Sequence, residues 1–182
     1  IDQFSLERVS KSGAKFDYEK GKWFNHQYLQ LRSNEVLADQ FMPYLEDKGI
    51  ICDKAKVAKV IGLTKDRVNF VSELWEQVNF FFVAPEEYDE KSLKKRWKED
   101  SPKHMNEMLT LLEAHEDWSA EGLDNLIMPW IAEKEYGVGI VMNAFRICLV
   151  GAARGPHIWN ITDVLGKEET LRRVRIAIEK LS

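Results

Sequence analysis

The stretch FRICLVGAARGPHIWNITDVLGKEETLRRVRIAI, residues 145 to 178, gives the clearest structural signals in the sequence. It begins inside an apolar run from Ile140 to Val150, whose length and composition predict a buried helix. The segment from Gly151 to Pro156 must turn, because glycine and proline interrupt regular backbone hydrogen bonding. After Gly166, apolar residues return at helical spacing, at Leu171, Val174, Ile178 and Leu181. The stretch therefore predicts a helix, a tight turn and another helix.

Helical spacing of apolar residues recurs upstream, so we expect an all-α protein. It predicts helices at 34 to 47, 53 to 61, 65 to 79, 103 to 115 and 120 to 134. The run VNFFFV at 78 to 83 could form a buried strand, but we interpret it as the frayed end of a helix. In the last helix the basic residues are expected on the polar faces: Arg172, Arg173, Arg175 and Lys180.

The segment YEKGKWFNHQYLQL, residues 18 to 31, is also predicted to be a helix, with Asp17 as its N-cap. Its aromatic and apolar side chains form a stripe that we expect in the core: Trp23, Phe24, Tyr28 and Leu31. Trp75 is assigned to the core as well. The segment from Pro85 to Pro102 is dense in charge and bracketed by helix breakers, which favours a connector or an internal boundary.

Composition indicates a globular protein that can bury a core. The chain has 182 residues, of which 45% are hydrophobic and 31% charged. It opens at Ile1, without a basic start before an apolar run, and we expect a cytoplasmic piece of a longer protein that has no membrane partner. The cysteines and histidines are scattered and show no metal-ligand spacing, so no metal site is expected: Cys52, Cys148, His26, His104, His115 and His157.

The distribution of charge is more informative than the net charge of -4. From Tyr136 to Thr162 there is no acidic residue, and the only basic or titratable side chains there, tyrosine and cysteine apart, are Arg146, Arg154 and His157. Such a surface would not repel phosphate. A second basic cluster consists of Lys54, Lys56, Lys59, Lys65 and Arg67, and a third of Arg8, Lys11 and Lys15. Taken alone, each cluster is more simply a solvated helix face.

Short matches to catalytic motifs do not identify an enzyme. The phrase VSKS at 9 to 12 resembles the lysine loop of class I aminoacyl-tRNA synthetases, and HIWN at 157 to 160 resembles their histidine motif. Their order is reversed, and no alternating strands and helices lie between them to build a nucleotide-binding sheet. The pair Gly137 and Gly139 lacks the third glycine of a dinucleotide fingerprint. No catalytic residues are assigned.

Both ends of the sequence resemble one family. The segment FSLERVSKSGAKFDYEKGKWFNHQYL, Phe4 to Leu29, resembles the region that follows the catalytic domain in bacterial-type glutamyl-tRNA synthetases, with FSLERV, KFD and WFN in the family's order. Residues 145 to 178 resemble the family's closing pattern of an arginine, a glycine-proline turn and LGKEETL before a final helix. The middle, about 34 to 135, has weaker motifs.

The resemblance implies that the chain has two regions with separate roles and that catalysis belongs to another domain. Residues 1–33 would end the stem-contact region, residues 34–182 would form a helical anticodon-binding domain, and an internal division could lie near 85–102. The partners would be tRNA(Glu) and the catalytic domain missing from the amino-terminal side, with no role in DNA binding. The parent enzyme would use ATP and Mg, whereas this fragment would need no cofactor and would be inactive alone.

The resemblance also implies which residues read the anticodon. Arg146 matches a family arginine at the anticodon pocket, and the turn residues Gly155, Pro156 and Ile158 match backbone and apolar contacts to an anticodon base. Arg67 aligns by spacing with the arginine that reads the last anticodon base. Three neighbours are further candidates for RNA contact: Arg154, His157 and Trp159.

Structural explanations for these residues and other functions for the chain remain open. Arg146 could be an arginine lying along the core, Pro156 a helix-breaking turn and Arg154 a solubilising loop residue. A non-catalytic helical protein-interaction domain would fit the net acidity, and it would bind RNA without salt dependence or not at all. A small-molecule enzyme would need a pocket with convergent titratable groups, which the sequence does not indicate.

Overall fold

The computed structural model describes residues 17–182, and within that range every regular element is a helix. The expected all-α class is therefore confirmed. The predictions made for Phe4 to Phe16, including the VSKS phrase and the basic cluster at Arg8, Lys11 and Lys15, lie outside the described residues.

The helices are, in chain order, α1 (Tyr18–Leu31), α2 (Asn34–Asp47), α3 (Lys54–Gly62), the 3-10 turns η2 (Lys65–Arg67) and η3 (Val71–Glu73), α4 (Leu74–Val78), η4 (Asn79–Phe81), α5 (Glu90–Arg96), α6 (Ser101–Ala114), α7 (Ala120–Glu133), α8 (Val138–Val150), α9 (Ile158–Leu165) and α10 (Lys167–Leu181).

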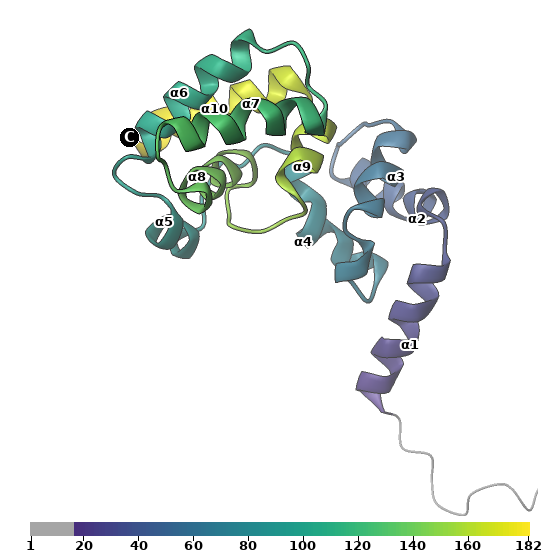
Figure 1. Ribbon diagram of the computed structural model, residues 1–182. Helices are drawn as coiled ribbons and strands as arrows, with labels where there is room; N and C mark the ends of the chain where they lie inside the picture. The colour runs from purple at the N-terminus through teal and green to yellow at the C-terminus, as the bar shows by residue number, and fades with distance from the viewer. Residues whose placement is uncertain (1–16) are drawn as a thin grey trace, which may run out of the picture.

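Two groups of helices share one continuous core (Figure 1). Helices α2 and α3 pack against each other, while α6, α8 and α10 form the second group. The short helix α9 lies between the groups and contacts both α3 and α10. Fully buried side chains from the two sides, such as Phe41 and Phe145, belong to the same apolar cluster. The position of α9 matters for function, because the predicted glycine-proline turn leads directly into it.

Most of the predicted helices are confirmed. α1 and α2 lie where expected, α10 begins directly after Gly166 as expected, and α3, α6, α7 and α8 differ by one or two residues at their ends. The Asp17 carboxylate accepts a hydrogen bond from the Lys20 backbone N–H at 3.1 Å, so the predicted N-cap is confirmed. The run from Val78 to Val83 contains the end of α4 and the 3-10 turn η4, as expected for a helix end. Helices α5 and α9 were not predicted.

The single helix expected from 65 to 79 is wrong. The backbone is extended at Val68 and again at Phe70, so the segment divides into η2, η3 and α4. Contacts with α1 compensate for the lost helical hydrogen bonds, since a ring nitrogen of His26 lies 2.8 Å from the Val68 carbonyl oxygen and Asn25 donates to the Asn69 carbonyl. A tertiary partner has overridden the local helical pattern.

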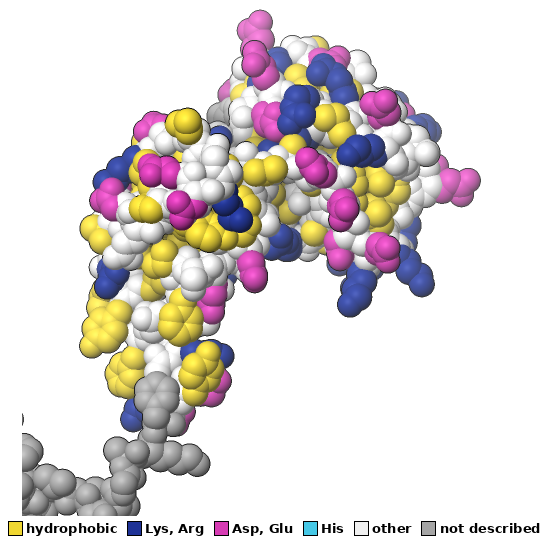
Figure 2. Space-filling model, turned by 180° about the vertical axis from the view of Figure 1, so that it is seen from behind, with side chains coloured by type: hydrophobic (Ala, Val, Ile, Leu, Met, Phe, Trp, Pro, Cys, Tyr) yellow, Lys and Arg dark blue, Asp and Glu magenta, His cyan; other side chains and the backbone are white. Residues whose placement is uncertain are grey.

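The aromatic stripe on α1 is not in the core, so that expectation is also wrong. Trp23 is 56% exposed, Tyr28 64% and Leu31 82%, and Leu29 is the only buried residue of this helix. Hydrophobic side chains stand out along the narrow end of the molecule that α1 forms (Figure 2). Helix α1 projects from the body and touches it mainly through polar side chains, which explains why its apolar face has no partner within residues 17–182. Trp75, in contrast, packs partly buried against the core.

The charged segment from Pro85 to Pro102 contains α5 and is attached to the second group of helices. The Asp89 N–H donates to the Gly151 carbonyl at 2.8 Å, and the Trp97 indole donates to the Leu181 carbonyl at 3.2 Å. The segment is therefore hydrogen-bonded to the end of α8 and to the end of α10. A domain division at this point stays a prediction.

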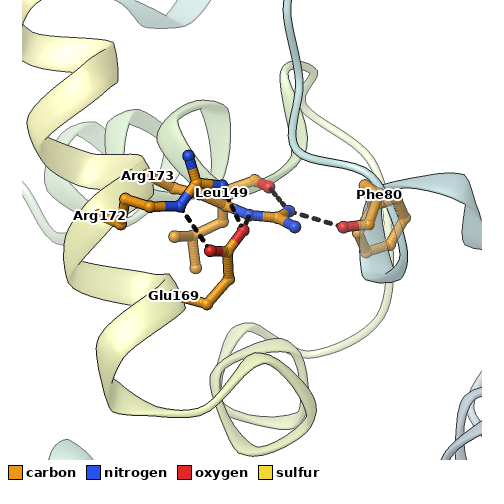
Figure 3. A network of polar contacts seen from close by, with 5 residues as sticks. All are labelled: Phe80, Leu149, Glu169, Arg172 and Arg173. Atoms are coloured by element: carbon orange, nitrogen blue, oxygen red, sulfur yellow. Dashed lines mark hydrogen bonds and ion pairs between the residues drawn. The ribbon is translucent and has the colours of Figure 1, made fainter. Parts of the chain in front are cut away.

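Arg173 lies inside the protein, although it was expected on a polar face of the last helix (Figure 3). Its guanidinium donates to the Phe80 carbonyl at 2.6 Å, the Leu149 carbonyl at 2.8 Å and the Glu169 carboxylate at 2.7 Å. These bonds tie α10 to η4 and to the end of α8, where carbonyl groups lack helical partners. The buried charge is stabilised here because its Nε is paired with a carboxylate and its Nη1 donates to two carbonyls.

Candidate nucleic-acid interface

The turn between α8 and α9 depends on two glycines. Gly151 ends α8 with φ of 78°, and a Cβ at this position would come within 2.8 Å of Pro85 Cβ and 2.9 Å of the Glu87 carbonyl oxygen. Gly155 has φ of 109°, which side-chain-bearing residues rarely adopt. The sequence GAARGP thus places the loop backbone closer to its neighbours than larger residues would allow.

Arg146 holds this turn through hydrogen bonds to two of its backbone carbonyls. It lies one turn before the end of α8, and its Nη1 donates to the Pro156 carbonyl at 2.7 Å and to the Arg154 carbonyl at 3.3 Å. The side chain is half buried, and its Nε and Nη2 groups make no hydrogen bond with residues 17–182. Arg146 therefore has a structural role through Nη1, which holds the turn. Its Nε and Nη2 donors remain available for a ligand.

A second arginine reaches the same region from η2. The pKa of Arg146 is lowered, first by burial and then by the positive charge of Arg67. Arg67 lies at the surface, and its nearest carboxylate is that of Asp66, at 4.0 Å. Two guanidinium groups predicted separately from the sequence therefore lie close enough to repel each other. An anion or an electron-rich base edge bound between them would relieve that repulsion.

Next to Arg146 a pocket of about 230 Å³ opens between α7, α8 and the start of α9. Its lining combines apolar, amide and charged side chains: Asp124, Met128, Met142, Asn143, Arg146, His157, Ile158 and Trp159. Ile158 is only 3% exposed, so it acts as a fixed wall of the pocket. Apolar walls with a few polar groups suit a flat, partly polar ligand such as a nucleobase.

The remaining predicted residues occupy different positions around the turn. Pro156 is buried beneath it, and His157 is exposed at the N-cap of α9. Trp159 is buried, and its indole N–H donates to Asp124 Oδ1 at 2.8 Å. Arg154 is exposed, points away toward α4 and donates to the Glu76 carbonyl. Arg154 therefore lies across the turn from the Arg146 pocket.

Four lining residues were missed by sequence reasoning: Asp124, Met128, Met142 and Asn143. Met142 and Asn143 precede Arg146 by four and three positions, which places them on the same face of α8, so helical spacing could have found them. Asp124 and Met128 lie on α7, and only the packing of α7 on α8 and α9 brings them to the pocket.

A larger cavity lies on the other side of the turn. It has a volume of about 750 Å³ and is lined by residues 151–154 of the turn and by the chain around α4 and α5. Three carboxylates line it, those of Glu86, Glu87 and Asp89, together with Arg154. Acidic walls repel phosphate, so the smaller pocket beside Arg146 is the better candidate for binding RNA.

Two lysines of the second basic cluster are paired with carboxylates. Lys54 pairs with Asp39 at 2.6 Å, and Lys59 pairs with Asp163 at 2.7 Å.

In the described part of the chain, histidines, cysteines and carboxylates form no group of three that could hold a metal ion. Within 17–182, none of the helices has the length and apolar character that crossing a membrane requires.

Comparison with known proteins agrees with this geometry. Residues 36–178 match the family model described as anticodon binding domain. The glutamate–tRNA ligases of Phocaeicola vulgatus and Porphyromonas gingivalis are 57% and 52% identical to this chain over 181 residues, which is 100% of this chain and 36% of each relative.

Solved structures give the same result for the fold. The crystal structure of a glutamate tRNA ligase from Elizabethkingia meningosepticum in complex with its amino acid superposes with a TM-score of 0.90 at 40% identity, covering 98% of this chain and 36% of that one. The chain thus spans about a third of the length of the relatives it matches. On its matched residues and its helical fold, this chain belongs to the anticodon binding domain family, and over its whole length it is similar to part of the glutamate–tRNA ligases.

Proposed function

We propose that this chain binds the anticodon arm of tRNA(Glu) as part of a glutamate–tRNA ligase. The observation that supports this most directly is the position of Arg146, which holds the glycine-proline turn and lines one small pocket together with His157 and Ile158. The similarity to glutamate–tRNA ligases supports tRNA(Glu) as the RNA that this chain would bind.

The residues around the pocket suit the reading of unpaired bases. The free guanidinium donors of Arg146 would bond to base acceptors, and Ile158 and the two methionines would pack on the base face. The rigid turn lowers the conformational entropy lost on binding, because the carbonyls of Arg154 and Pro156 are already held by Arg146. Arg67 would add contact to a neighbouring base or phosphate.

The chemistry of the parent enzyme would take place elsewhere. ATP and magnesium would bind to the catalytic portion, which we expect on the amino-terminal side of this chain, and the whole enzyme would work in the cytoplasm. The residues described here would orient the tRNA and carry out no covalent step. The isolated chain should therefore bind tRNA(Glu) and form no glutamyl-tRNA.

One observation favours a protein contact in addition. The apolar face of α1, with Trp23 and Tyr28 more than half exposed, is of the kind that protein partners cover. The alternative function, a non-catalytic helical protein-interaction domain, would use such a face in place of the pocket.

Binding of RNA separates the two functions. Fluorescence anisotropy would compare tRNA(Glu) with the same tRNA carrying three changed anticodon bases. We expect tighter binding of the unchanged tRNA and a loss of affinity as salt concentration rises. Equal affinity for both RNAs, or none for either, would exclude anticodon recognition. Formation of glutamyl-tRNA by the isolated chain would contradict the assignment of catalysis to the missing portion.

A further inference from the structure

The pocket beside Arg146 contains a single acidic side chain, that of Asp124. We propose that Asp124 determines base specificity by accepting a hydrogen bond from the exocyclic amino group of the base that Arg146 contacts. The inference rests on the proposed function, because it assumes that an anticodon base enters this pocket.

Asp124 is held in one orientation by a buried neighbour. Its Oδ1 accepts from the Trp159 indole N–H at 2.8 Å, and Trp159 is only 3% exposed. The second carboxylate oxygen, Oδ2, accepts no hydrogen bond from residues 17–182. Oδ1 therefore fixes the orientation of the carboxylate, and Oδ2 is available to a ligand in the pocket.

Arg146 and Asp124 line the same pocket without neutralising each other. No ion pair joins them in the described part of the chain, although the space they line is only about 230 Å³. Arg146 is instead held by the carbonyls of the turn, and Asp124 by an indole on α9. The pocket thus offers hydrogen-bond donors from α8 and an acceptor from α7 at separate positions.

This arrangement selects a base in preference to a phosphate. A phosphate would bond to the guanidinium, but the Asp124 carboxylate would repel it. A base edge that combines acceptors with an amino donor satisfies both side chains. Cytosine has this combination, with O2 and N3 as acceptors and an N4 amino group, whereas uracil places the acceptor O4 where cytosine has the amino group. The pocket should therefore prefer cytosine to uracil.

The variant Asp124→Asn tests the proposal with little change in shape. The amide keeps an oxygen for the Trp159 indole and presents an NH₂ group, a donor, in place of the second oxygen. Dissociation constants would be measured for the full 182-residue chain with anticodon stem-loops that carry cytosine or uracil at each anticodon position in turn. We expect wild type to prefer cytosine by roughly tenfold at one position, and the variant to lose or invert that preference. Asp47→Asn, at the exposed end of α2, is the control.

A second measurement needs no variant. A stem-loop with N4,N4-dimethylcytosine at the preferred position has no amino N–H, and wild type should bind it no better than the uracil form. An unchanged cytosine-to-uracil ratio in Asp124→Asn, or tight binding of the dimethylated base, would overturn the role of Asp124 while leaving anticodon binding intact. Failure of wild type to bind any stem-loop would overturn the proposed function and this inference together.

Discussion

Arg146 Nη1 lies 2.7 Å from the carbonyl oxygen of Pro156, so the arginine that lines the pocket also holds the turn that leads into the pocket residues His157 and Ile158. Because one side chain has both tasks, its removal must affect stability and binding at once. Among residues 17–182, the Arg67 side chain makes no hydrogen bond to the turn, and its one ion pair there is with the neighbouring Asp66. The two arginines can therefore be distinguished experimentally.

Replacement of Arg146 by alanine should weaken binding and lower stability. The turn would lose a charged donor to two carbonyls, which costs about 1.5 to 3 kcal/mol for such hydrogen bonds. Loss of a base contact should weaken binding of the cognate stem-loop by about 1 to 3 kcal/mol. Urea unfolding and anisotropy titration would measure the two effects. Identical titration curves for wild type and Arg146→Ala would exclude base contact by this residue.

Replacement of Arg67 by alanine should weaken RNA binding and leave stability almost unchanged. An exposed side chain whose only ion pair spans 4.0 Å contributes little to folding. If Arg67 contacts a phosphate, the slope of log affinity against log salt should fall by about one. Lys134→Ala, at the exposed C-cap of α7, is the matched control, because it removes one positive charge that lines neither of the two cavities beside the turn. A salt slope that falls equally in both variants would show that only the net charge matters.

Gly155→Ala should destabilise the protein, whereas Gly139→Ala should not. At Gly155, φ is 109° and a Cβ would meet Phe80 Cζ at 3.3 Å and Ile161 Cδ1 at 3.4 Å. Backbone strain of this kind costs about 1 to 3 kcal/mol. Gly139 lies in the first turn of α8 with open space around its Cβ position, so alanine there is tolerated or slightly favourable. Thermal unfolding of both variants would test this, and equal melting temperatures would contradict it.

The sequence predicted the fold well where a pattern is local. The apolar run of α8, the break at Gly151 and the spacing of α10 depend only on neighbours in the chain, and all three are confirmed. The errors occur where distant segments meet. The extended backbone at Val68 depends on His26 of α1, and the burial of Arg173 depends on carbonyls of Phe80 and Leu149. Nothing in the local spacing of either segment reveals such a partner.

The candidate site shows the same difference between features that are local in the sequence and contacts between distant segments. Arg146 and the turn lie together in the sequence, and the structure keeps them together. Arg67 reaches them through the fold, and its assignment came from the resemblance to a family. Asp124 was beyond sequence reasoning, because the acid-poor interval from Tyr136 to Thr162 says nothing about which side chain α7 places against it. An acidic group in a basic site is visible only in three dimensions.

Glu169 should make the stability of the protein sensitive to acid. Hydrogen bonds from Arg172 and Arg173 lower the pKa of its carboxyl to about 2 (Figure 3). Because the folded-state pKa lies below the unfolded one of about 4.3, the ionised carboxylate stabilises the folded state above that value, and this stabilisation is lost as pH falls toward 2.

The variant Glu169→Gln removes this titration, so its free energy of unfolding should fall less than that of wild type between about pH 4.5 and pH 2. At neutral pH it should be less stable than wild type, because the buried Arg173 guanidinium loses its only carboxylate among the described residues. Glu168→Gln, the exposed neighbour, is the control and should follow wild type over the same range. Urea unfolding at a series of pH values gives both results. Parallel curves for wild type and Glu169→Gln would show that the carboxylate has the same proton affinity in the folded and unfolded chain.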